Sequence, residues 1–221
     1  MFNKNSLRNF LGELPLAAEL DYTLRQKNRA RKDHYNLSRP AKSLPRAVEQ
    51  AGPFIEKAKP GKNILFFATL HYWIEQAAYL SLTLAGLGHK VTLMTLPYSE
   101  WYKEMDKLTQ RQRALHTRDA LAALTPFVKH ASLLDPSTRP SGQSGRRLKP
   151  APVLPAALQA EVEEVSQWDV QYTLMREEVD MDAPKDRAIL ELRIRRNTFA
   201  ALAALEWMQT HQPDVVLIPN G

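Results

Sequence analysis

The clearest hydrophobic pattern lies in the second quarter of the chain. Residues 64–70 form a short apolar run, which predicts a strand buried on both faces. Apolar residues then recur at spacings of three and four, which predicts a helix over residues 74–85, with Gly86 and Gly88 as stop signals. Residues 91–96 predict a second buried strand. Strand, helix and strand in this order are typical of a βαβ unit, so we expect a parallel α/β sheet.

The rest of the chain continues in the same style. The pattern predicts helices over residues 100–123 (polar and at the surface), 156–168 and 185–211, and strands over residues 127–134, 171–175 and 214–219. Residues 136–155 are rich in Pro, Gly and Ser without periodicity, which predicts a loop or linker. We therefore expect a Rossmann-like α/β domain over residues 61–221, with a parallel sheet of about four to six strands. A mainly helical N-terminal arm, residues 1–60, precedes it.

The excess positive charge belongs to this arm. Residues 1–60 carry 12 Lys and Arg against 6 Asp and Glu, whereas residues 61–221 carry 18 of each. The charge is densest over residues 25–32. Such an arm either meets an anionic membrane or forms a solvated helix face. No nucleic-acid-binding motif accompanies the charge, so we do not expect a nucleic-acid partner.

Composition narrows the chemistry. The chain has no cysteine, which excludes disulfides, thiolate nucleophiles and Cys-based zinc sites. The six histidines show no metal-ligand spacing, and neither the P-loop motif nor G-x-G-x-x-G occurs. No run reaches the length of a membrane span, and the N-terminus lacks the core of a signal peptide. We expect a cytoplasmic protein, with the arm as a possible peripheral contact with the inner face of the membrane.

The C-terminal end of the chain follows a predicted buried strand directly. Such strands are normally followed by a crossover helix, and ligand loops begin at their carboxyl ends. This favours a chain cut from a longer protein, although a small domain that ends on a strand is an alternative.

Four segments occur in an order that resembles a known family: ILFFATLHYW, GHKVT, RIRRNTFAALAAL and PDVVLIPNG. Together they resemble the N-terminal half of a GT-B glycosyltransferase of bacterial capsule, lipopolysaccharide and cell-surface glycan biosynthesis. The resemblance covers residues 62–221, with a poor match over residues 136–155. The chain departs from the family at its first loop, where several such enzymes are rich in glycine and this chain has His71-Tyr72-Trp73.

Several candidate site residues follow from these patterns. Ligands of parallel sheets bind beyond the carboxyl ends of the strands, which points to a predicted turn at His71, Tyr72 and Trp73. The resemblance implies that His71 is the general base, since an imidazole can take a proton near neutral pH; the alternative is a structural histidine. Aromatic rings can stack on sugars or pack in the core. The candidate substrate-binding residues are Tyr72, Trp73, Tyr98, Trp101, Asn220 and Gly221.

Other charged groups are weaker candidates. Arg176 to Glu178 follow a predicted strand, and either reach the ligand or form a charged loop. Arg193, Arg195 and Arg196 cannot share one face of a helix, so we expect most of them to be solvated or paired with Glu191. His89 opens a predicted strand, and we expect a structural role for it.

The resemblance implies the acceptor-side domain of a glycosyltransferase that moves a sugar from a nucleotide-sugar donor to a bacterial surface glycan or lipid-linked acceptor. It also implies that the donor binds mainly to a missing C-terminal domain, so that no cofactor or donor is expected on these residues alone and the isolated chain is inactive. A non-catalytic nucleotide- or sugar-binding module with a basic docking arm is the first alternative. A different α/β enzyme with the same half-fold is the second.

Overall fold

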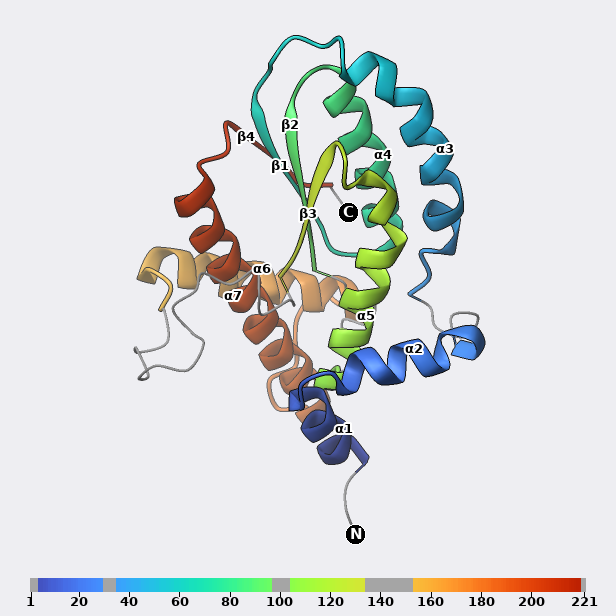
Figure 1. Ribbon diagram of the computed structural model, residues 1–221. Coiled ribbons are helices and arrows are strands. Elements are labelled where there is room, and N and C mark those ends of the chain that lie inside the picture. Colours follow the sequence, from blue (N-terminus) through green and yellow to red (C-terminus); the bar gives the residue numbers. More distant parts are fainter. Residues whose placement is uncertain (1–3, 30–34, 97–103, 134–152, 220–221) are drawn as a thin grey trace. The chain divides into compact units, whose positions relative to one another are not determined.

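The computed structural model describes residues 4–29, 35–96, 104–133 and 153–219 (Figure 1). Two compact units emerge from it. The first comprises Met1–Ser99, Met105–Thr138 and Gln212–Gly221, and the second comprises Glu100–Glu104 and Arg139–His211. Among the described residues, no helix is both long and apolar enough to cross a bilayer.

The first unit is an α/β domain. Its helices and strands, in chain order, are α1 (Lys4–Glu13), α2 (Ala17–Arg29), α3 (Ser38–Ile55), β1 (Asn63–Ala68), α4 (His71–Gly86), β2 (Lys90–Thr95), α5 (Lys107–Ala120), the 3-10 turn η1 (Ala122–Leu124), β3 (Val128–Ser132) and β4 (Val215–Leu217). The predicted Rossmann-like α/β class is confirmed, because the four strands form one parallel sheet in the order β3-β2-β1-β4.

The sheet is centred on β1 and β2. Phe66 of β1 pairs with Leu93 of β2, and Ile64 of β1 pairs with Val215 of β4. Side chains alternate between the two faces of a strand, so Ile64, Phe66 and Ala68 share one face. These residues are buried in a core with apolar side chains of α3 and α4. In Figure 1, α4 lies beside β1 and β2, and α3 lies outside α4.

Helix α4 ends as its glycines predict. Gly88 has a φ of 90°, the His89 N–H donates to the Leu84 carbonyl, and the Gly88 N–H donates to the Ala85 carbonyl. These two bonds form a Schellman motif, which needs a left-handed residue at this position. The chain can then turn straight into β2.

Helices α1 and α2 pack against α5. Arg8 of α1 donates to Asp106 and Thr109 at the start of α5, over 3.0 and 2.7 Å. Asp106 caps α5, since its side chain accepts from the Thr109 N–H at 2.9 Å. The predicted helix over 100–123 therefore begins later than expected, at Lys107, because residues 104–106 have no regular structure and Asp106 supplies the cap.

In the second unit, the described residues form two helices, α6 (Ala156–Leu174) and α7 (Pro184–His211), which pack against each other. The predicted strand over residues 171–175 is wrong. These residues form the last turn of α6 and its cap Met175, which has φ 54° and ψ 47°. Consequently Arg176 to Glu178 follow a helix and not a strand. The predicted loop 136–155 lies almost entirely outside the described residues.

Candidate functional site

The candidate site is the carboxyl end of β1, where α4 begins. Only two residues separate Ala68, the end of β1, from His71, the first residue of α4. The predicted turn at residues 71–73 is wrong, since all three residues lie in the first turn of the helix. The Ile74 N–H donates to the Leu70 carbonyl at 2.8 Å and closes that turn. His71 nevertheless lies at the edge of the sheet where α/β proteins bind their ligands.

The three residues of this first turn have different environments. His71 is partly buried, and its ring meets the ring of Tyr35 edge-on at 6.3 Å. Tyr72 is 45% exposed, and its ring lies 5.3 Å from that of His71. Trp73 packs against the hydrophobic core. The turn therefore leaves the phenol of Tyr72 exposed and the imidazole of His71 partly exposed, while the indole of Trp73 packs against the core.

Tyr35 fixes the inner wall of the site. It is only 3% exposed, and its hydroxyl lies 2.5 Å from Thr117 Oγ1 on α5. Thr117 donates its own proton to the Arg113 carbonyl at 2.8 Å, so the Tyr35 hydroxyl must donate to Thr117. The Arg113 guanidinium lies 5.3 Å from the centre of the Tyr35 ring. These contacts hold the Tyr35 ring in place, so the surface against which His71 packs is fixed.

His116 joins the same cluster from α5. Its ring meets that of Tyr35 edge-on at 6.3 Å. The Leu37 N–H donates to its Nε2 at 3.4 Å, and Nδ1 lies 3.4 Å from the hydroxyl of Tyr22 on α2. An Nε2 that accepts leaves Nδ1 to carry the proton in the neutral ring. We infer a structural role for His116, since both ring nitrogens face protein groups.

The neighbouring strands also end in polar residues. Thr95 ends β2 and is fully buried, with its Oγ1 3.0 Å from His130 Nε2 on β3. Ser132 ends β3 and pairs in register with Thr95. By the alternation of the strands, these three side chains share the face that packs against α4. The apolar core of this face thus becomes polar at the carboxyl ends of the strands, where His71 also lies.

One carboxylate lies a helical turn beyond His71. Glu75 is 9% exposed and forms an ion pair with Arg39 of α3. The hydrogen bond that Arg39 donates to Glu75, together with the negative charge of Glu75, raises the pKa of the Arg39 guanidinium above its usual range. Glu75 is engaged by this cation, so His71 is the better candidate for a base.

The start of α4 adds a further feature. Its N-cap residue, Leu70, offers no side-chain hydrogen bond to the first turn. Backbone N–H groups of a first turn have no partner within the helix, and they favour a negatively charged group. The phenol of Tyr72 and these N–H groups can donate hydrogen bonds to a polar or anionic ligand, and the imidazole of His71 can accept a proton from it.

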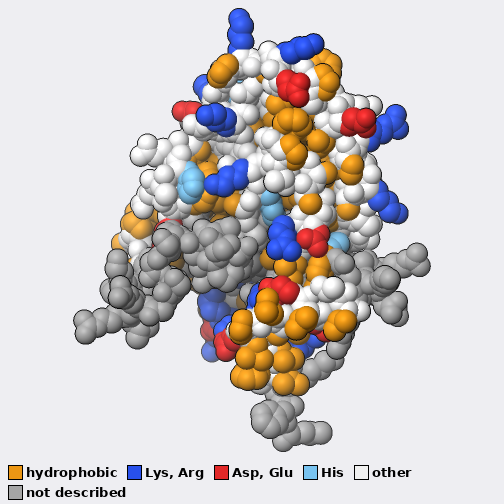
Figure 2. All heavy atoms as spheres, in the orientation of Figure 1, with side chains coloured by type: hydrophobic (Ala, Val, Ile, Leu, Met, Phe, Trp, Pro, Cys, Tyr) orange, Lys and Arg blue, Asp and Glu red, His pale blue; other side chains and the backbone are white. Residues whose placement is uncertain are grey.

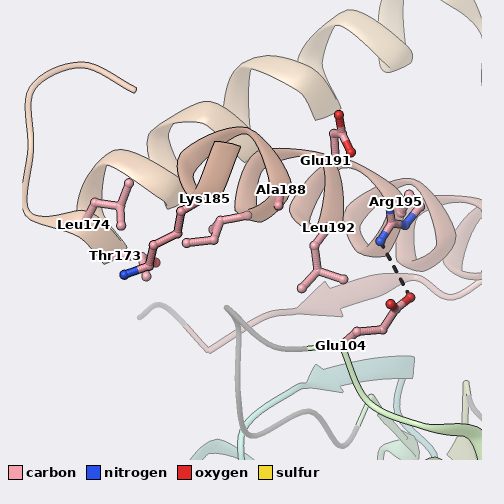
Figure 3. Close-up of a pocket in the computed structure, with 9 residues that line it drawn as sticks. Glu104, Thr173, Leu174, Lys185, Ala188, Glu191, Leu192 and Arg195 are labelled. Carbon is pink, nitrogen blue, oxygen red and sulfur yellow. Dashed lines mark ion pairs between the residues drawn. The ribbon is translucent and has the colours of Figure 1, made fainter. Parts of the chain in front are cut away.

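The second unit has a separate pocket with a volume of about 490 Å³ (Figure 3). Its lining residues are Glu104, Thr173, Leu174, Lys185, Ala188, Ile189, Glu191, Leu192 and Arg195. Arg195 lies 3.6 Å from Glu104, the pair joined by the dashed line in Figure 3. The lining combines two acidic and two basic residues with an apolar floor, so its charges balance and select no charged ligand.

Two of the three closely spaced arginines in the middle of α7 are buried, contrary to our expectation that most of them are solvated or paired with Glu191. Arg193 and Arg196 are only 4% and 6% exposed. Arg193 donates to Thr173 at 2.9 Å and lies 3.6 Å from an oxygen of Asp169. Burial lowers the pKa of Arg193 to about 10, against the opposing effect of Asp169 and with a smaller contribution from Arg196. Arg195 is the exposed member of the three.

The place of four other predicted site residues beside His71 stays a prediction. Tyr98, Trp101, Asn220 and Gly221 lie outside the described residues. His89 has a structural contact at the amino end of the sheet, where its Nδ1 accepts from the Lys62 N–H at 3.0 Å. From the sequence we did not identify three residues around His71 and the ends of the neighbouring strands, which are Tyr35, Thr117 and His130. His130 had a signal, since it alternates with Val128 in a predicted buried strand, but nothing in the sequence connects Tyr35 with the site.

Comparison of the chain with protein-family models, with curated proteins and with solved structures found no match. No group of three or more potential metal ligands occurs among the residues that the structure describes. The site must therefore be interpreted from its own geometry.

Proposed function

We propose that this chain is the acceptor-side domain of a glycosyltransferase, with His71 as the general base. The observation that supports this most directly is the place of His71, partly buried in the first turn after the carboxyl end of a central parallel strand. The segments that resemble GT-B enzymes agree with it. The proposed substrates are a nucleotide-sugar donor and a glycan or lipid-linked acceptor of the bacterial surface.

In the proposed reaction, an acceptor hydroxyl attacks the anomeric carbon of the donor sugar. The new C–O bond forms as the bond from that carbon to the nucleotide phosphate breaks, and His71 takes the hydroxyl proton. Tyr35 would hold the imidazole in position, because its own ring is fixed by Thr117 and Arg113. The exposed ring of Tyr72 would stack on the C–H face of the acceptor sugar. The donor would bind mainly to a second domain.

The test is the substitution His71→Gln in a protein that contains this chain together with its donor domain. We expect turnover to fall by about 10²- to 10⁴-fold, with donor affinity nearly unchanged. His89→Gln is the matched control, since His89 lies at the opposite edge of the sheet and glutamine can still accept from Lys62. Melting temperatures of both variants would show that the fold is retained. Nearly full turnover of the His71 variant would show that His71 is not the general base.

A non-catalytic nucleotide- or sugar-binding module is the second candidate. The uncapped start of α4 favours it, because free N–H groups at a helix start attract phosphate. Titration calorimetry of the 221-residue chain with UDP- and GDP-sugars distinguishes the two hypotheses. Tight donor binding that His71→Gln does not change favours the module, whereas weak or absent donor binding favours the acceptor-side domain.

A further inference from the structure

Helices α1 and α2 expose a face of large apolar side chains. The residues of this outer apolar face, with exposed fractions of 51%, 57%, 38%, 66%, 61% and 81%, are Leu7, Phe10, Leu14, Leu16, Leu20 and Leu24. Figure 2 shows hydrophobic side chains gathered on the surface over α1 and the start of α2. Single exposed leucines are ordinary, but a contiguous group on two helices indicates an interaction surface.

The orientation of α1 is fixed by its contacts with α5. A Cβ on Gly12 would lie 2.4 Å from the Leu108 backbone nitrogen, so only glycine permits this close approach. Asn9 accepts from the Lys107 N–H at 2.9 Å. At about 3.6 residues per turn, Leu7 and Phe10 fall on the side of α1 opposite these contacts. Leu7 and Phe10 therefore point away from α5, whereas Leu11 packs against the apolar cluster of Ala18, Leu108 and Leu115.

Helix α2 has the same two-sided arrangement. Ala18 is fully buried against Leu108 and Leu115 of α5, whereas Leu20 and Leu24, four residues apart, are exposed. Each helix thus packs on α5 through both apolar contacts and hydrogen bonds, and its other side carries exposed large apolar residues that are unpartnered among the described residues.

Each acidic residue of the two helices binds a side chain of α5. Glu13 pairs with Lys107, Glu19 accepts two hydrogen bonds of 2.6 Å from Arg111, and Asp21 accepts from Gln112. These are all the acidic residues of α1 and α2. The sequence of α2 ends with Arg25, Lys27 and Arg29, and the net charge of residues 1–60 is positive. The outer side therefore carries apolar groups without carboxylates, on a segment with excess basic charge.

We propose that the outer apolar face docks on an anionic lipid bilayer, with its side chains inserted among the headgroups. Amphipathic helices that combine exposed Leu and Phe with basic residues lie in the membrane interface in this way. The basic residues add attraction to anionic lipid, which salt weakens. A second copy of the chain is a poorer occupant, because two positively charged segments repel each other. The inference stands apart from the proposed function, since it uses none of the residues around His71.

Flotation of the 221-residue chain with vesicles tests this. One set of vesicles is phosphatidylcholine alone and the other is phosphatidylcholine mixed with phosphatidylglycerol. We expect binding to the anionic vesicles, and this binding should weaken as salt is raised. The double variant Leu20→Gln/Leu24→Gln should weaken it at least about tenfold, since two inserted side chains are lost.

The matched control is Leu80→Gln/Leu87→Gln, which changes two leucines of similar exposure, 51% and 65%, at α4. This control should bind the vesicles like the parent chain. Equal binding to neutral and anionic vesicles, or loss of binding in the control as well, would overturn the proposal. So would absent vesicle binding together with dimers, seen by sedimentation, that only the Leu20/Leu24 variant abolishes.

Discussion

Two glycines at the end of α4 lie two residues apart in different backbone conformations. Gly88 has a φ of 90°, and a Cβ built on it would lie 1.9 Å from the Lys59 carbonyl oxygen. Gly86 is the last residue of the helix, and a Cβ there would meet nothing within 4 Å. The same substitution should therefore have opposite effects at the two positions.

We predict that Gly88→Ala lowers the free energy of unfolding by about 2–4 kcal/mol, because a left-handed residue gains a Cβ that collides with backbone. Gly86→Ala should raise it by about 0.5–1 kcal/mol, because alanine favours the helical state. Urea unfolding of both variants measures the difference. Similar effects of the two substitutions would contradict the conformation described for Gly88.

A second residue-scale effect concerns the end of α6. Met175 caps this helix in the left-handed conformation and is 83% exposed, so its side chain contributes little packing. We predict that Met175→Gly stabilises the helix end by about 0.5–1 kcal/mol, because glycine adopts this conformation without strain. Tyr172→Gly, at an equally exposed position inside the helix, should destabilise it by about 1 kcal/mol. Amide exchange of the last turn of α6 would show slower opening in the first variant and faster opening in the second.

At the scale of elements, two carboxylates fasten α1 and α2 to α5. Burial alone would raise the pKa of Asp106, but hydrogen bonds from the Thr109 backbone and from Arg8 outweigh it and lower the pKa. Burial would likewise raise the pKa of Glu19, but the hydrogen bond from Arg111 and the charge of Arg111 contribute to a net lowering of this pKa. A carboxyl whose pKa is lower in the folded state stabilises the fold above its unfolded pKa of about 4. That contribution is lost as the pH falls through the folded-state value.

We therefore predict that the attachment of α1 to α5 weakens below about pH 4. Asp106→Asn should lower stability at neutral pH and flatten this acid dependence, while asparagine keeps the helix cap. Asp119→Asn is the control, since Asp119 is exposed and pairs only loosely with its neighbour Arg118, at 3.4 Å. Unfolding midpoints between about pH 7 and pH 3 measure the effect. An Asp106 variant with the parent's acid dependence would contradict it.

The sequence predicted the elements whose pattern is set locally. The βαβ unit is clear because β1 and β2 are short apolar runs and α4 carries both apolar spacing and terminal glycines. Residues 171–175 misled because Tyr172 and Thr173 favour strands when taken alone. In the structure Ser166, Val170 and Thr173 share a helical face against α7, and this packing decides the conformation. The packing against α7 therefore outweighs the strand propensity of Tyr172 and Thr173.

The candidate site was only partly predictable for a similar reason. His71 could be placed because it follows a strand directly. Tyr35 reaches the same corner only because it packs against α5, more than 80 residues later in the chain. The burial of Arg193 likewise depends on Thr173 and Asp169, which belong to another helix. Partners as distant as these leave no periodic signal in the sequence.

At the scale of the molecule, β4 closes the sheet from far along the chain. Asn63 and Asp214, which lie 151 residues apart, exchange hydrogen bonds where β4 meets β1. During synthesis the ribosome releases β1, β2 and β3 long before β4. Until then the outer edge of β1, with Ile64, Leu65 and Phe66, presents unpaired backbone groups on an apolar strand. Such an edge is a template for pairing with another chain. The nascent chain is therefore more prone to aggregation until β4 pairs, because β4 moves the edge of the sheet from the six residues of β1 to a strand of only three.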